Sequence, residues 1–218
     1  MSKSLLSTTY FGPVQWYQKL HRSELVLIEQ HESFLKQTYR NRCTIATTNG
    51  LLSLTVPVEH DSKNDTIRDT LISSHGNWQH LHWNALQSAY GDSPFFLYYS
   101  DDLRPFFEKK WKYLFDYNME ITNKMCELLD ISPKIELTEH FLPISSKKKD
   151  KNDETMQLVA NTDIADFRYT IRPKQPLPDK DFNPRRYYQV FEQRYGFQPN
   201  LSVLDLLFCC GPESIFFL

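Results

Sequence analysis

Short apolar runs and amphipathic stretches alternate at the start of the chain. Residues 25–28 form a run typical of a buried strand, and residues 5–10 read as a short strand before it. Between them, Pro13 suits the first turn of a helix that reaches Leu20, because proline is well tolerated there. Strand, helix and strand with short links predict a βαβ unit.

A β-hairpin is predicted next. Residues 43–47 and 51–58 are strand candidates, and Thr48, Asn49 and Gly50 separate them. Asn-Gly is the strongest short hairpin signal, because both central residues of the turn must reach positive φ. We therefore expect an antiparallel hairpin within a mixed, mostly parallel sheet.

The middle of the chain is mainly helical in pattern. Ser74 or Asn77 can cap a helix that runs to about Tyr90. A strand is predicted over 95–99, and a long helix over 103–129, where apolar residues recur at helical spacing.

The pattern changes after residue 130. Residues 131–183 contain several prolines and the lysine-rich run 147–151, which indicate an extended arm with a mobile loop. Helical patterns return at 184–195 and 202–210. Ser202 can cap the second of these helices, and a glycine follows it.

The fold class predicted is therefore α/β. An N-terminal βαβ unit and a β-hairpin in a mixed, mostly parallel sheet precede a long helix and a mainly helical C-terminal part. We divide the chain into an α/β core over 1–130 and a second part over 131–218 that packs on it.

Composition narrows the classes of partner. The 25 Lys and Arg residues against 27 Asp and Glu give a net charge of −2, which argues against nucleic acid. No apolar stretch approaches the ~18 residues that span a bilayer, and the N-terminus lacks the apolar region of a signal peptide. Cys43, Cys126, Cys209 and Cys210 form no C-x-x-C pair, which favours a reduced, cytoplasmic protein. Cofactors and oligomeric state stay unknown at this level.

The segment 34–45 is basic and aromatic. If it is helical, Lys36 and Arg40 share one face, and an anion or a carboxylate between them would offset their repulsion. Arg42 enters the hairpin, where its guanidinium can bind a carboxylate or phosphate with two hydrogen bonds. Alternatively, the segment is a solvated basic turn paired with Glu29 and Glu32.

The segment 75–83 contains three histidines and two tryptophans. On a helix, the side chains of His80 and His82 diverge by roughly 200°, so we predict no metal site. His82 suits proton transfer, because its ordinary pKa lies near neutral pH. Alternatively, it is a core histidine packed against Trp78.

The turn 10–17 follows the first strand. Ligands of open α/β sheets bind beyond the carboxyl ends of the strands, and helix N-termini attract anions. Gln15 and Tyr17 are therefore candidate contacts. Glu29 and Gln30 close the second strand and are expected near the same rim.

Several motifs, in this order, resemble the WbqC-like family over roughly residues 5–130 and again over 205–214. The family begins with a tyrosine–proline turn, continues through a Phe-x-Lys…Tyr/Trp-x-Asn-Arg motif and an LTVPV strand, and ends this region with Trp…His-Trp…Ala-Tyr…Pro. The matching positions are Tyr10, Pro13, Phe34, Lys36, Tyr39, Asn41, Arg42, 54–58, Trp78, His82, Trp83, Ala89, Tyr90 and Pro94.

One departure concerns a pair of aspartates that many members carry before the central motif. This chain has Gln30 and His31 at those positions, and Glu29 or Glu32 beside them is the candidate replacement.

The resemblance implies a transferase acting on a sugar or small amine in surface polysaccharide biosynthesis, by acyl or aminoacyl transfer. In this hypothesis His82 is the catalytic base, and Lys36 and Arg42 bind an anionic donor. The other candidate ligand-binding residues are Gln15, Tyr39, Asn41 and Trp78.

Two alternative functions remain open. One is nucleotidyl transfer, although the first turn lacks the paired histidines that such enzymes use on phosphates. The other is a non-catalytic module that binds an anionic ligand or a biosynthetic partner protein.

Overall fold

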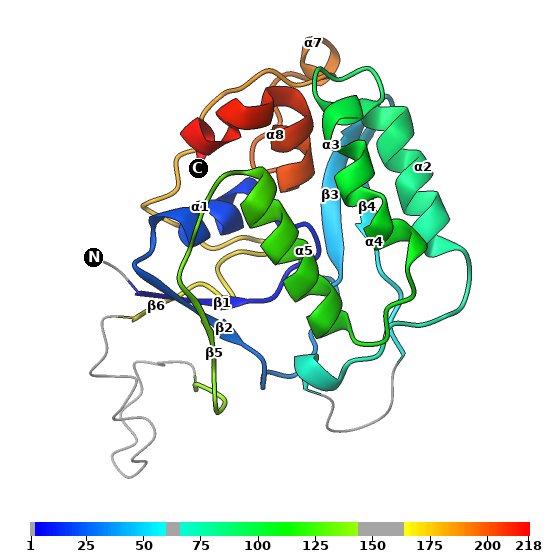
Figure 1. Ribbon diagram of the computed structural model, residues 1–218. Coiled ribbons are helices and arrows are strands. Elements are labelled where there is room, and N and C mark those ends of the chain that lie inside the picture. The colour runs from blue at the N-terminus through cyan, green and yellow to red at the C-terminus, as the bar shows by residue number, and fades with distance from the viewer. Residues whose placement is uncertain (1–2, 60–65, 144–163) are drawn as a thin grey trace.

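The computed structural model describes residues 3–59, 66–143 and 164–218, and the fold is mixed α/β, as predicted (Figure 1). Its larger sheet has the strand order β5-β2-β1-β6, and each neighbouring pair is parallel. The strands are β1 (Lys3–Ser7), β2 (Leu25–Glu29), β5 (Ile135–Leu137) and β6 (Ile164–Asp166). All four strands therefore end at the same edge of the sheet.

Helix α1 (Val14–Arg22) joins β1 to β2 and confirms the predicted βαβ unit. Pro13 is its N-cap in an extended conformation, one position before the first helical residue. Trp16, Tyr17 and Leu20 are buried on α1, so apolar burial rather than capping stabilises this helix.

The hairpin is confirmed as β3 (Arg42–Thr47) and β4 (Gly50–Thr55), which pair antiparallel. Gly50 has a φ of +102°, as a tight hairpin turn requires. These two strands form a second sheet, separate from the parallel one.

The strand predicted at 95–99 is wrong, because α3 (Phe96–Leu103) occupies this segment. Phe96, Tyr99 and Leu103 are buried at helical spacing, whereas Leu97 is 81% exposed. A single strand cannot bury positions three and four apart on one face.

The long helix predicted over 103–129 is divided. Its parts are α4 (Pro105–Glu108) and α5 (Leu114–Leu128). The segment between them runs beside residues 70–72, where Ile72 N donates to Lys112 O at 2.9 Å and Leu114 N donates to Thr70 O at 2.9 Å. These tertiary hydrogen bonds replace those of a continuous helix. The preceding helix is α2 (Trp78–Tyr90), and the 3-10 helix η1 (Ile67–Asp69) packs against α5.

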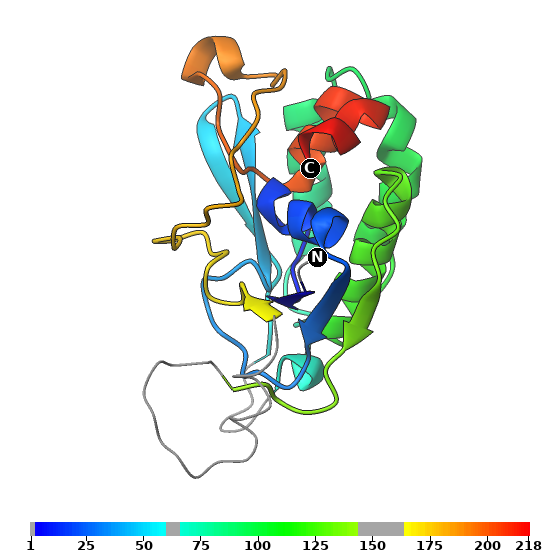
Figure 2. The ribbon, with the colours of Figure 1, turned by 90° about the vertical axis from the view of Figure 1, so that its left-hand side faces the viewer.

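At the C-terminal end, α8 (Val203–Cys210) is confirmed together with its predicted signals. The Ser202 hydroxyl accepts a hydrogen bond from Leu204 N, and Gly211 follows with a φ of +55°. Every residue of α8 is buried, and the helix contacts both α1 and β3 (Figures 1 and 2). The 3-10 helix η2 (Gly211–Phe217) continues from it.

The helix predicted over 184–195 is largely wrong, since only α7 (Glu192–Tyr195) forms there. Two side chains of this segment instead bind a buried carboxylate on α8. Tyr187 Oη and Gln189 Nε2 donate to Asp205 Oδ2 at 2.7 and 2.9 Å.

Strands β5 and β6 lie within the segment predicted to be an extended arm, and they pair with β2 and β1 of the proposed core. The lysine-rich run 147–151 lies outside the described residues. The division of the chain at residue 130 stays a prediction.

Candidate functional site

A buried polar cluster lies where the parallel strands end. Ser7 ends β1, Glu29 ends β2 and Asp166 ends β6. Three side chains from the following loops complete it. We name these residues the carboxyl-edge cluster: Ser7, Glu29, Glu32, Arg40, Asp166 and Arg168.

Arg40 forms the first half of the cluster with Glu32. Its Nε donates to Glu32 Oε1 at 2.8 Å, and Nη2 donates to Glu32 Oε2 at 2.5 Å and to Ser7 Oγ at 2.7 Å. The side chains of Arg40 and Glu32 are only 3% and 1% exposed. A bidentate pair removed from water in this way fixes the loop 32–40 against the end of β1.

Arg168 forms the second half and links three segments. It binds Asp166 through Nε and Nη2, and its Nη1 donates to Glu29 Oε2 at 3.2 Å and to Leu142 O at 2.7 Å. Glu29 Oε1 accepts in addition from Thr138 Oγ1 at 2.8 Å. Glu29, one of the two predicted replacements for the family's aspartates, is therefore saturated with hydrogen bonds.

The cluster carries more negative than positive charge. Three carboxylates and two guanidiniums give −3 and +2, so its formal charge is −1. The ring of Tyr169 lies 5.9 Å from both guanidinium carbons. Burial raises the pKa of the Tyr169 hydroxyl, and the nearby Glu32 carboxylate raises it further.

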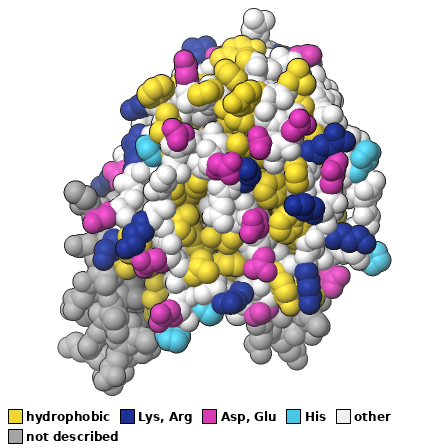
Figure 3. Space-filling view, in the orientation of Figure 1, with side chains coloured by type: hydrophobic (Ala, Val, Ile, Leu, Met, Phe, Trp, Pro, Cys, Tyr) yellow, Lys and Arg dark blue, Asp and Glu magenta, His cyan; other side chains and the backbone are white. Residues whose placement is uncertain are grey.

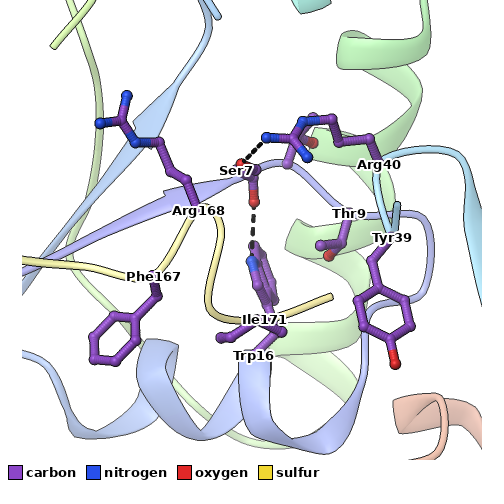
Figure 4. A pocket seen from close by; sticks show the side chains of 9 residues that line it. Ser7, Thr9, Trp16, Tyr39, Arg40, Phe167, Arg168 and Ile171 are labelled. Atoms are coloured by element: carbon purple, nitrogen blue, oxygen red, sulfur yellow. Dashed lines mark hydrogen bonds between the residues drawn. The ribbon is translucent and has the colours of Figure 1, made fainter. Parts of the chain in front are cut away.

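A small cavity adjoins the cluster (Figure 4). It is lined by Ser7, Thr8, Thr9, Trp16, Tyr39, Arg40, Phe167, Arg168 and Ile171. Its volume is about 10 Å³, which suits a single water-sized group. Trp16 Nε1 donates to Ser7 O at 2.9 Å and holds the end of β1 over the helix.

Two hydroxyls of this cavity lack partners. Thr8 and Thr9 are 0% and 3% exposed, and their Oγ1 atoms make no hydrogen bond within the described part of the chain. A buried hydroxyl without a partner costs free energy, so such atoms point to a missing ligand or water. They lie in the turn after β1, where α/β sheets bind ligands.

His82, the predicted catalytic base, is 6% exposed on α2. Its Nδ1 lies 2.9 Å from Tyr10 Oη, and it shares a second hydrogen bond with the backbone of Thr55. Burial lowers its pKa to about 4, so the ring is neutral at pH 7. These surroundings are those of a core histidine, which was the alternative interpretation.

Of the other predicted ligand-binding residues, Gln15 and Asn41 make internal hydrogen bonds. Gln15 exchanges hydrogen bonds with Asn200 and donates to Asp179 Oδ2 at 2.9 Å. Asn41 Nδ2 donates to Val56 O at 2.8 Å. Tyr39, in contrast, lines the small cavity of Figure 4.

The remaining three lie apart from that cavity's lining. Lys36 is exposed, Arg42 is half-buried in β3, and Trp78 lines a different cavity. Trp78 and His82 are in ring contact at 5.2 Å. In the described segments, no hydrogen bond, ion pair or ring contact joins Lys36 or Arg42 to either of them.

Sequence reasoning missed Thr8, Thr9, Asp166 and Arg168. A signal existed for the threonines, because they directly follow a strand that ends at the ligand-binding edge. None existed for Arg168, which is 139 residues from Glu29 in the chain.

Other classes of site and surface are less prominent. Within residues 3–59, 66–143 and 164–218, no three His, Cys, Asp or Glu side chains are placed to hold a metal ion. None of the helices in these ranges is long and apolar enough to cross a membrane. On the face seen in Figure 3, Lys and Arg side chains are interspersed with Asp and Glu.

The fold and site define an α/β protein with a buried ion-pair cluster and cavity at the carboxyl edge of a parallel sheet. The model of the WbqC-like protein family matches residues 8–216, and the chain belongs to this family. It is similar to the uncharacterized protein Rv1507c of Mycobacterium tuberculosis. The two are 28% identical over 202 residues, which cover 86% of this chain and 84% of the relative. No solved structure matches the chain.

Proposed function

We propose that this protein is a transferase that acts on a primary amine, of a sugar or a small molecule, at the carboxyl-edge cavity. The observation that carries the proposal is the pair of buried, unpartnered hydroxyls of Thr8 and Thr9, two residues that line this cavity beside Arg40 and Arg168. Hydroxyl oxygens accept hydrogen bonds from an amine, and the guanidiniums of Arg40 and Arg168 in the lining favour its neutral, nucleophilic form.

The size of the cavity supports a single functional group rather than a whole sugar. A volume of about 10 Å³ admits one amine, while the rest of the acceptor stays outside. The rings of Trp16, Tyr39 and Phe167 line the same cavity and supply apolar contact around the amine's carbon.

Acyl or aminoacyl transfer is the reaction that we assign. The amine nitrogen forms a bond to the acyl carbon, the bond to the donor's leaving group breaks, and the proton that the nitrogen releases goes to that leaving group. The family resemblance supports surface polysaccharide biosynthesis as the context. The four unpaired, buried cysteines support a reducing compartment such as the cytoplasm.

The amine site is tested with Thr9→Val, which removes the hydroxyl and keeps the shape of the side chain. We expect the variant to lose its preference for glucosamine over glucose in calorimetric titration. Its free energy of unfolding should stay unchanged or rise, because an unsatisfied buried hydroxyl costs about 1–3 kcal/mol. Acetyl transfer is then followed as the loss of free amine from glucosamine, with acetyl phosphate or an acetyl thioester as donor.

Thr122→Val is the matched control. Its hydroxyl is also buried, but it donates to Asn118 O at 2.8 Å. That variant should lose stability and keep amine binding. The proposal fails if the unmodified protein binds glucosamine no better than glucose, or if Thr9→Val leaves the preference intact.

A non-catalytic binding module is the second candidate, favoured by one observation. All six carboxylate oxygens of Glu29, Glu32 and Asp166 accept hydrogen bonds, so none of them is free to move a proton. Amine binding that depends on Thr9, without transfer from any donor offered, would select this candidate.

A further inference from the structure

A second and larger cavity lies at the N-terminal end of α2. Its volume is about 270 Å³, close to the lower end of the range for small-molecule sites. Trp78 and Trp111 both line it, and Trp78 belongs to the histidine- and tryptophan-rich segment of the sequence. The cavity therefore suits a ligand the size of one sugar ring.

Trp78 and Trp111 form part of the cavity wall, and contacts with other aromatic rings hold them in place. Trp78 packs edge-on against His82 at 5.2 Å and against Tyr117 at 6.1 Å. Trp111 stacks on Phe106 at 5.9 Å with an interplanar angle of 11°. Aromatic walls held in this way offer a preformed apolar surface to a ring.

Two hydrogen-bond donors without a partner among the described residues belong to the lining of the cavity. Trp111 Nε1 is buried and has no partner in the described residues. Lys110 is exposed and, within the same residues, makes no ion pair. None of the nine lining residues is acidic, so Lys110 gives the lining a positive formal charge.

The start of α2 adds to this positive character. Asn77 is the N-cap, but its side chain makes no capping hydrogen bond, and the first turn contains no acidic residue. The first N–H groups of the helix thus keep their partial positive charge toward the cavity end. Together with the unpartnered indole N–H and Lys110, these groups match an anion.

We propose that this cavity binds a monosaccharide that carries a phosphate or carboxylate group. The ring lies against Trp78 and Trp111, and the anionic group lies between Lys110 and the start of α2. The site shares no lining residue with the amine cavity and does not depend on the function proposed for it.

Calorimetric titration of the full chain with glucose 1-phosphate, glucuronate, glucose and inorganic phosphate tests the proposal. Glucose 1-phosphate or glucuronate should bind at least about tenfold more tightly than glucose, because a charge-assisted hydrogen bond contributes that much. Lys110→Gln should remove most of this difference. The neighbouring Lys109→Gln, also an exposed lysine but outside the lining, should leave it unchanged.

Asn77→Asp separates binding from folding, because it acts on them in opposite directions. Aspartate caps a helix as well as asparagine and favours the positive helix end, so the melting temperature should hold or rise. The added charge in the lining should weaken the anionic sugar about tenfold or more.

The proposal is overturned by no binding of either anionic sugar, by binding that Lys110→Gln and Asn77→Asp leave unchanged, or by glucose binding as tightly as the anionic sugars. Inorganic phosphate binding as tightly as glucose 1-phosphate would also overturn it, by removing the role of the ring. Thr9→Val should not affect this titration, so failure here and failure of the amine site are told apart.

Discussion

The ion pair between Arg40 and Glu32 should make a large contribution to stability that a single substitution reveals. Glu32→Gln keeps the shape of the side chain and removes its charge. The guanidinium of Arg40, 3% exposed, is then left without the carboxylate that accepts two of its hydrogen bonds. Only the bond to Ser7 Oγ and one bond to the new amide oxygen can persist.

Breaking a buried pair by removing one partner costs about 3–5 kcal/mol. The hydrogen bonds that persist place Glu32→Gln near the lower end, at about 3 kcal/mol. For a chain of 218 residues, each kcal/mol lowers the melting temperature by about 2–4 °C, so we expect a drop of about 6–12 °C. Urea unfolding and a thermal melt at pH 7 measure the two quantities.

Two further variants make the result interpretable. Glu108→Gln breaks the ion pair with Arg104, whose side chains are 57% and 60% exposed, and should cost less than about 0.5 kcal/mol. The double variant Glu32→Gln with Arg40→Met removes both charges and should recover most of the lost stability. The reasoning is refuted if Glu32→Gln costs no more than Glu108→Gln.

Other outcomes follow from buried groups. The pKa of His82 is about 4 when folded and 6.5 when unfolded, so the stability it contributes, about 3 kcal/mol, is complete above pH 6.5 and is lost as the pH falls toward 4. Urea midpoints across this range should flatten in His82→Gln but not in the exposed His80→Gln. Gly211→Ala should lose about 2 kcal/mol, because a Cβ there would lie 2.5 Å from the Phe95 ring and φ is +55°; a neutral result in urea unfolding would contradict this. Burial raises the pKa of Cys43 to about 12, so native protein should leave this thiol unmodified by Ellman's reagent at pH 8, and rapid modification would disprove its burial.

The elements that sequence predicted well are those whose signals are local. The Asn-Gly turn and the Ser202 cap act within a few residues. Ser202 caps α8 as predicted, and the hairpin forms where predicted, although of Asn49 and Gly50 only Gly50 has a positive φ. The strand prediction for 95–99 failed because a run of five aromatic and apolar residues fits a strand or a helix. Only tertiary burial decides between the two.

The candidate site was predicted only in part, for a related reason. Glu29 was placed at the right rim, since it closes a recognisable strand, and Glu32 was named only as a partner of the basic segment or a replacement for the aspartates. Arg168, the partner of Glu29, comes from a proline-rich segment without strong periodicity, and no local pattern marks it. His82 has the residue type of a base, but burial and two hydrogen bonds occupy its ring, which sequence does not show.

The order in which the sheet receives its strands has a consequence for synthesis of the chain. Glu29 is made 139 residues before Arg168, its only ion-pair partner among the described residues. At about 5–20 residues per second, a ribosome needs roughly 7–28 s to add that stretch. During this interval β1 has no β6 to pair with, and the Glu29 carboxylate at the sheet edge has no ion-pair partner. The sheet edge beside β1 should therefore remain open until the strand and arginine near residue 168 emerge.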